Sequence, residues 1–232
     1  MSFHLHGPLD PESPLFVGRE TELARIERWL RRGDAVGAVL GGRQNGKTSV
    51  MLMARERARP WQPVVFVDFQ GVAGADPAAC ARHLAEQIAD QLAGALAPAP
   101  PLPESAGGLQ GYLRAVASAA HAPRIGLFLD ELGVLPDETR RWLGSVLRAS
   151  FNGRMVHREL GRWTFVLAGG VELCDMAVHR SSPLRNVLDE IYLGDLSETE
   201  VAALLAGAAA PDLPASRAAE WPTTRYTPFN LL

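Results

Sequence analysis

Residues 41–48 read GGRQNGKT, and this segment constrains the fold more than any other part of the chain. It fits the pattern G-x-x-x-x-G-K-[ST], in which a glycine-rich loop wraps its backbone N–H groups around a phosphate. An apolar run over 35–40 precedes it, and a helical pattern that ends before Pro60 follows it. The segment therefore predicts a phosphate-binding loop between a buried strand and a helix N-terminus. The expected binding residues are Gly41, Gly42, Arg43, Gln44, Asn45, Gly46, Lys47, Thr48 and Ser49.

Lys47 is the only lysine among the 23 basic residues of the chain. In a chain so strongly biased towards arginine, a retained lysine suggests a position that arginine does not serve. An ammonium group is a compact point charge and suits contact with the β and γ phosphates, whereas a guanidinium is planar and wider. We therefore expect Lys47 to bind these phosphates, and the hydroxyl of Thr48 to bind Mg²⁺.

Short apolar runs alternate with helical patterns along the chain. Within the runs, apolar and polar residues do not alternate, which is typical of a parallel sheet covered on both faces. The sequence thus predicts an α/β fold with a doubly wound parallel sheet, whose ligands bind at the carboxyl ends of the strands. The expected strands span 35–40, 64–69, 125–129, 163–168 and a short 191–193; the expected helices span 20–32, 49–59, 76–96, 109–121 and 136–151, with one more capped by Ser197 and Glu200. The proline-rich stretch 97–108 predicts an exposed connector.

Two acidic residues, Asp130 and Glu131, end the apolar run over 125–129. In a doubly wound sheet this strand end faces the same edge as the glycine-rich loop. Asp130 is expected to hold Mg²⁺ with oxygen ligands, and Glu131 to orient and deprotonate an attacking water. Asp130 and Glu131 are therefore expected catalytic residues beside the phosphate site. The expected Mg²⁺ ligands are Thr48 and Asp130.

Composition excludes several classes of function. The net charge of −3 provides no overall basic field for nucleic acid or anionic membranes. No apolar run approaches the roughly 18 residues of a membrane span, and the start has no signal-peptide pattern. Cys80 and Cys174 lie too far apart for a metal motif and predict free thiols. The expected location is therefore the cytoplasm, and we expect this chain alone to have no membrane partner and no nucleic-acid ligand.

Residues 15–20, LFVGRE, precede a helix and the glycine-rich loop, and residues 182–186 and 191–200 read SPLRN and IYLGDLSETE. Together these segments resemble AAA+ ATPases of the origin-recognition and STAND type. The resemblance implies that the backbone at Val17 and Gly18 lies against the adenine of ATP or ADP, that Phe16 belongs to the same nucleotide site, and that Arg19 braces the base or a phosphate. An exposed ion pair is the alternative for Arg19. The implied organisation is a lead-in over 1–14, an ATPase core over 15–194 and a partial helical lid over 195–232.

The chain departs from the family pattern in places. Such ATPases usually carry a polar sensor side chain at the end of the fourth strand, where this chain has Ala168 followed by two glycines. In the family, a proline of the helical lid contacts the base, and Pro228 is at the corresponding position here. The rest of the lid that relatives carry is not in this sequence. We therefore expect either that the chain is a fragment or that a protein partner or a second subunit completes the lid. Arg180 and Arg185 are candidates for an arginine finger.

Three functions remain open from the sequence. The first is an ATP-binding switch domain with slow hydrolysis, acting in bacterial-type signalling, conflict or regulatory assemblies. The second is a nucleotide-binding scaffold with little hydrolysis. The third is a fragment of an origin-type, DNA-associated ATPase.

Overall fold

The computed structural model describes residues 7–13, 15–170, 172–173, 176 and 182–207. Within them the chain forms a five-stranded sheet in the order β2-β3-β4-β1-β5, and every neighbouring pair is parallel. After β1 the chain places β2 at the far edge and returns through β3 and β4 to lie beside β1 again. The predicted doubly wound α/β fold is confirmed. The strands are β1 (Val36–Gly41), β2 (Val64–Asp68), β3 (Ile125–Asp130), β4 (Trp163–Gly169) and β5 (Leu188–Leu193).

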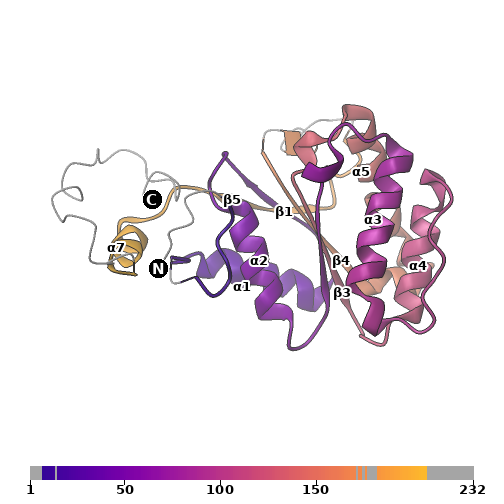
Figure 1. Ribbon diagram of the computed structural model, residues 1–232, viewed down its shortest axis with the longest axis horizontal. Coiled ribbons are helices and arrows are strands. Elements are labelled where there is room, and N and C mark those ends of the chain that lie inside the picture. Colours follow the sequence, from indigo (N-terminus) through magenta and orange to yellow (C-terminus); the bar gives the residue numbers. More distant parts are fainter. Residues whose placement is uncertain (1–6, 14, 171, 174–175, 177–181, 208–232) are drawn as a thin grey trace.

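Helices cover both faces of this sheet (Figure 1). One face carries α1 (Glu20–Arg32) and α2 (Lys47–Ala58), and the other carries α3 (Pro77–Gln91), α4 (Leu109–Ala119) and α5 (Asp137–Gly153). Successive strand residues point to opposite faces. Because both faces are covered, β3 and β4 are buried along their whole length, which explains why their sequences are apolar except for Asp130 and Thr164.

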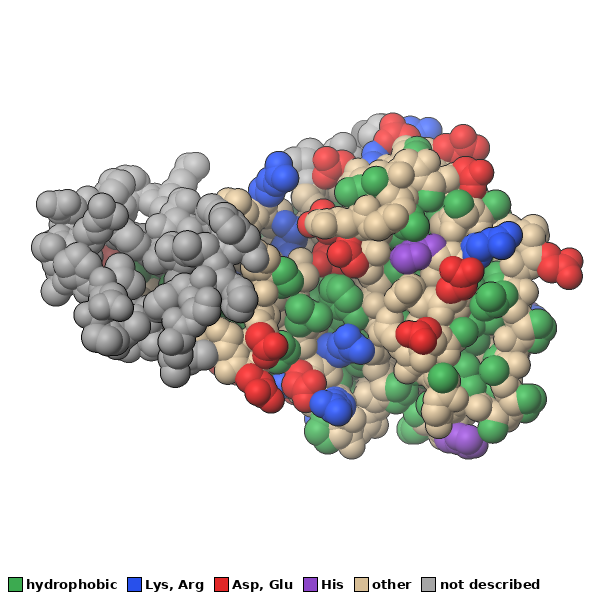
Figure 2. All heavy atoms as spheres, in the orientation of Figure 1, with side chains coloured by type: hydrophobic (Ala, Val, Ile, Leu, Met, Phe, Trp, Pro, Cys, Tyr) green, Lys and Arg blue, Asp and Glu red, His purple; other side chains and the backbone are tan. Residues whose placement is uncertain are grey.

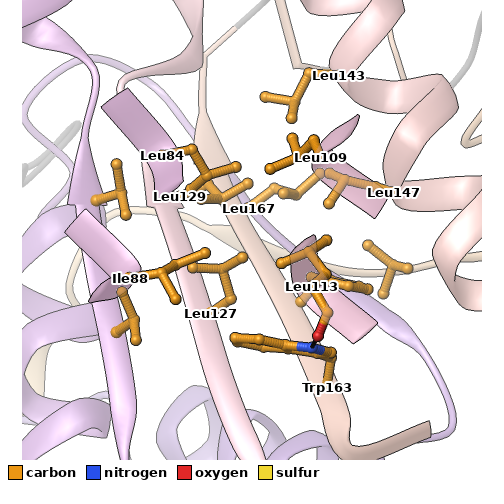
Figure 3. Close-up of a cluster of buried hydrophobic side chains, with 14 of the residues drawn as sticks. Leu84, Ile88, Leu109, Leu113, Leu127, Leu129, Leu143, Leu147, Trp163 and Leu167 are labelled. Carbon is orange, nitrogen blue, oxygen red and sulfur yellow. Dashed lines mark hydrogen bonds between the residues drawn. The ribbon is translucent and has the colours of Figure 1, made fainter. Parts of the chain in front are cut away.

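The larger core lies between the sheet and α3–α5 (Figure 3). There the indole N–H of Trp163 donates to the carbonyl of Leu113 at 2.9 Å, so the one polar atom of this side chain is satisfied. Phe128 points to the other face and packs in a second core with α1 and α2. The labelled leucines and isoleucine of the larger core are Leu84, Ile88, Leu109, Leu113, Leu127, Leu129, Leu143, Leu147 and Leu167.

Two elements differ from their expected bounds by three residues or more, and the others by no more than two. The helix expected to reach residue 96 ends at Gln91, where a short 3₁₀ turn (Ala93–Ala95) containing a glycine replaces it. The fifth strand is longer than expected, because β5 pairs with β1 from Leu188 onward. Its first residues include Asp189, which accepts a hydrogen bond from the Trp29 indole at 2.6 Å. Because Asp189 and Glu190 are polar, a search for apolar runs does not predict the first half of this strand.

The helix α7 (Glu198–Gly207) begins with the predicted capping box. The hydroxyl of Ser197 accepts from the Glu200 N–H at 3.3 Å, and the Glu200 carboxylate accepts from the Ser197 N–H at 2.8 Å. Among the described helices, none combines the length and apolar character needed to cross a bilayer. Cys80 is a buried free thiol, and Cys174 lies outside the described residues.

Candidate functional site

The glycine-rich loop joins the carboxyl end of β1 to the N-terminus of α2, as its sequence predicts. Gly46 caps the helix with φ 82°, a left-handed conformation that glycine adopts without steric cost. Gln44 is also left-handed, with φ 66°, a conformation that is costly for a residue with a side chain and that clusters at functional sites. The Lys47 ammonium curls back over the loop and donates to the carbonyls of Gly41 and Gly42, at 3.1 and 2.7 Å.

Two side chains of the loop and of α2 tie the phosphate-binding loop to distant segments. The Asn45 amide is buried and donates to the carbonyl of Leu193, the last residue of β5, at 2.8 Å. The Ser49 hydroxyl accepts from the backbone N–H of Leu9 at 2.9 Å. The loop is therefore fixed against the end of β5 and against the N-terminal lead-in before any ligand binds.

Asp130 and Thr48 come together at the carboxyl edge of the sheet. The Thr48 hydroxyl donates to the Asp130 carboxylate at 2.6 Å, and the Glu131 N–H donates to the other carboxylate oxygen at 2.9 Å. Asp130 is only 2% exposed. Burial raises the pKa of its carboxyl above the ordinary value, although the Thr48 and Glu131 hydrogen bonds oppose this. A hydroxyl and a buried carboxylate side by side are hard oxygen ligands, so these residues fit Mg²⁺.

Asp130 places a cost on the fold that Asp130→Asn should remove. The pKa of the Asp130 carboxyl is higher in the folded state than in the unfolded state. Below the unfolded-state pKa the carboxyl is protonated in both states and does not destabilise the fold. As pH rises through the folded-state pKa, the buried carboxyl must ionise, and the fold loses stability. Without nucleotide, Asp130→Asn should therefore melt higher than the unmutated protein at neutral pH. The gain should narrow as pH falls towards roughly 4, where the unfolded carboxyl takes up its proton.

The measurement is thermal unfolding of both proteins across this pH range, where each kcal/mol appears as about 2–4 °C. In the same variant, nucleotide binding should depend less on Mg²⁺, because a metal contact is lost. A melting temperature below that of the unmutated protein at neutral pH would contradict this account of Asp130.

Glu131 follows in a left-handed conformation, with φ 55°, directly after β3. Its N–H is held by the Asp130 carboxylate, so this unusual backbone turn is fixed by the residue before it. The turn brings Glu131 into the wall of the same cavity as Lys47 and Thr48. A second carboxylate therefore lies beside the glycine-rich loop, as the sequence predicts.

These residues line a cavity of about 460 Å³, within the range of small-molecule sites. One part of its wall is polar and is formed by the loop and Glu131. The other part is apolar and comes from the lead-in, the segment before α1 and the α7 region. The apolar and lead-in residues are Gly7, Pro8, Leu9, Leu15, Phe16, Val17, Leu196 and Leu204.

Arg19 lies in this wall, but its side chain is bound to protein. Its guanidinium donates to the carbonyl of Gly194 at 2.7 Å and pairs with Glu22 at 3.4 Å. It is 6% exposed, so Arg19 does form an ion pair, but in a buried position and not at the surface. Gly18 does not line the cavity and instead packs against Glu200.

Other candidates lie elsewhere. Arg185 is exposed before the amino end of β5, about 17 Å of strand from the loop at 3.3 Å per residue. Within one chain it is therefore separated from the phosphate-binding loop, and a role in a second subunit stays a prediction. Arg180 and Pro228 lie outside the described residues. At the expected sensor position, Ala168 is buried near the carboxyl end of β4 and pairs with Val39 of β1. Thr164 lies near the amino end of the same strand.

Several residues of the wall were not expected from the sequence. Gln70 lines the cavity just after β2, and the rule that ligands bind at carboxyl strand ends points to it. Leu9 and Leu196 carry no local signal, because their place depends on how the lead-in and the α7 region fold over the loop.

Comparisons with known proteins place this geometry in a structural class. No protein-family model matches the sequence, and no curated protein sequence matches it significantly. A Walker-type ATPase of Pyrococcus abyssi superposes with a TM-score of 0.67 at 15% identity, over 93% of this chain and 65% of that one. The chain has the AAA+ P-loop NTPase fold.

Two solved proteins of Aeropyrum pernix, ORC2 and ORC1, share this fold with the chain. ORC2, solved in ADPNP–ADP complexes, gives a TM-score of 0.59 at 14% identity over 87% of this chain and 54% of that one. ORC1, solved in complex with DNA, gives 0.53 at 18% identity over 82% and 49%. The chain thus spans about half to two thirds of the length of these AAA+ structures.

Proposed function

We propose that this chain binds ATP or ADP with Mg²⁺ and hydrolyses ATP slowly, as a nucleotide-dependent switch domain. The observation that carries the proposal is the convergence of Lys47, Thr48, Asp130 and Glu131 on one edge of the sheet, three of them in the wall of one cavity. The cavity joins this polar end to an apolar end, as a nucleotide with a charged tail and a flat base requires.

The residues of the proposed nucleotide site have different roles. The loop N–H groups and the start of α2 attract the negative phosphates. When a phosphate binds, Lys47 would donate its hydrogen bonds to phosphate oxygens in place of the Gly41 and Gly42 carbonyls. Thr48 and Asp130 would hold Mg²⁺, which neutralises charge on the phosphates when bound. Glu131 is placed to align a water and take its proton. The apolar wall around Phe16 and Leu196 would cover the base and exclude water.

Binding should raise the melting temperature of the protein. A ligand at 100 times its Kd stabilises the fold by about 2.7 kcal/mol, which corresponds to roughly 5–10 °C for a domain of this size. Thermal unfolding with saturating Mg-ADP, against Mg²⁺ alone, measures this shift. An unmoved transition would count against nucleotide binding.

A scaffold with little hydrolysis is the second candidate, and one observation favours it. The carboxyl end of β4 offers no polar side chain at Ala168, where the ATPases that this sequence resembles usually carry a polar sensor residue. The geometry of Glu131 favours hydrolysis instead, and the turnover of a Glu131 variant separates the two candidates.

The origin-type, DNA-associated alternative rests on the likeness in fold alone. On the coloured part of the face in Figure 2, basic and acidic side chains are interspersed and form no broad basic patch. A bacterial-type signalling role, a cytoplasmic location and a partner or second subunit stay proposals, and they rest on the sequence resemblance.

A further inference from the structure

Glu200 joins the start of α7 to the segment before α1. One carboxylate oxygen accepts from the backbone N–H of Arg19 at 3.1 Å, and the other accepts from the N–H and hydroxyl of Ser197, both at 2.8 Å. The capping box is thus only half of its role. We call Gly18, Arg19, Gly194, Ser197 and Glu200 the box–lid clasp.

The backbone of the segment before α1 is shaped around this carboxylate. Gly18 and Arg19 are both left-handed, with φ 67° and 61°. A Cβ on Gly18 would lie 1.9 Å from a Glu200 carboxylate oxygen, so only glycine permits the approach. Arg19 carries the conformational cost of a non-glycine residue in this region, and its two ends are held by Glu200 and by the Gly194 carbonyl.

An apolar contact accompanies the clasp. Leu196, Val201 and Leu204 form a small separate core, against which Leu15 and Val17 pack. Four of these five residues also line the apolar wall of the cavity, from both sides of the clasp. The clasp therefore fixes the distance between the two halves of that wall, and none of its five residues belongs to the glycine-rich loop around Lys47.

We propose that Glu200 is a positioning residue for the base end of the bound nucleotide. It contacts no ligand itself, and it holds the wall segments of Val17 and Leu196 at the spacing that a base needs. This inference rests on the proposed nucleotide binding. Without the carboxylate, the wall would have to be ordered when the base binds, and this ordering would weaken affinity. Ligands that occupy only the phosphate end should not sense the change.

The test compares two probes, Mg-ADP and Mg-tripolyphosphate, by calorimetric titration of the full chain. In Glu200→Gln, one amide N–H₂ replaces an acceptor, so the Arg19 and Ser197 donors cannot both be satisfied. We expect the Kd for Mg-ADP to rise about tenfold, equivalent to about 1.4 kcal/mol, and the Kd for tripolyphosphate to stay unchanged. Glu198→Gln is the matched control, because it removes an exposed carboxylate from the same helical turn and should leave both values unchanged.

The outcomes separate this inference from the proposed function. Unchanged Mg-ADP affinity in Glu200→Gln, or equal loss for both probes, overturns the positioning role. If the unmutated chain binds neither probe, the proposed nucleotide binding itself fails. If Glu200→Gln does not fold, Glu200→Asp keeps the charge but shortens its reach by one methylene, and it should show the same selective loss of Mg-ADP affinity.

Discussion

Lys47→Ala is expected to abolish measurable binding of Mg-ATP and Mg-ADP. The ammonium is the only lysine charge in the chain, and it lies over the loop carbonyls of Gly41 and Gly42, where phosphates would bind. Removing one partner of a desolvated charge pair costs about 2–5 kcal/mol, or roughly 30-fold to several thousand-fold in Kd. Calorimetric titration of the variant measures the loss.

Arg59→Ala is the control for this variant, because Arg59 is a cation at the far end of α2 with its side chain 77% exposed. Its affinity for nucleotide should equal that of the unmutated protein. Equal affinity in Lys47→Ala would mean that the loop does not bind phosphates and that the site has been wrongly assigned.

Glu131→Gln should keep ATP bound while hydrolysis falls by a factor of about 10² to 10⁴, roughly 3–5 kcal/mol of barrier. The amide has nearly the same shape as the carboxylate but does not take a proton from water. The backbone turn at this residue is fixed by Asp130, so the substitution should not move it. Phosphate release under single-turnover conditions, together with ATP affinity, measures the two effects separately.

Glu138→Gln removes an exposed carboxylate shortly after Glu131, in the first turn of α5, and should leave turnover unchanged. The unmutated chain is itself expected to be slow, because Ala168 offers no sensor side chain. Rapid turnover that Glu131→Gln does not reduce would show that Glu131 is not the base. Absence of turnover in the unmutated chain, with tight binding, would favour the scaffold.

Local patterns were sufficient for most of the fold. The glycine-rich loop, the buried strand ending in Asp130 and the capping box at Ser197 are signals within a few residues, and each lies where the sequence predicts. The strand β5 was underestimated because its polar first residues are stabilised by pairing with β1, a contact between segments about 150 positions apart. Such long-range pairing leaves no trace in apolar periodicity.

The candidate site divides in the same way. Lys47, Thr48 and Glu131 belong to recognisable motifs, whereas Leu9, Gln70 and Leu196 reach the cavity only through tertiary packing. The role of Arg19 was also beyond local reasoning, because its guanidinium and N–H bind groups at Gly194 and Glu200. Motif residues can be recognised from local sequence, whereas the positions of the residues that shape a cavity depend on the packing of the whole chain.

The central claim is that the cavity beside Lys47 is a nucleotide site. Calorimetric titration of the unmutated chain with Mg-ADP tests it most directly. The account predicts saturable binding of one nucleotide per chain, which competes with Mg-tripolyphosphate because both ligands occupy the same loop. Absence of saturable binding, or binding that tripolyphosphate does not reduce, would contradict it.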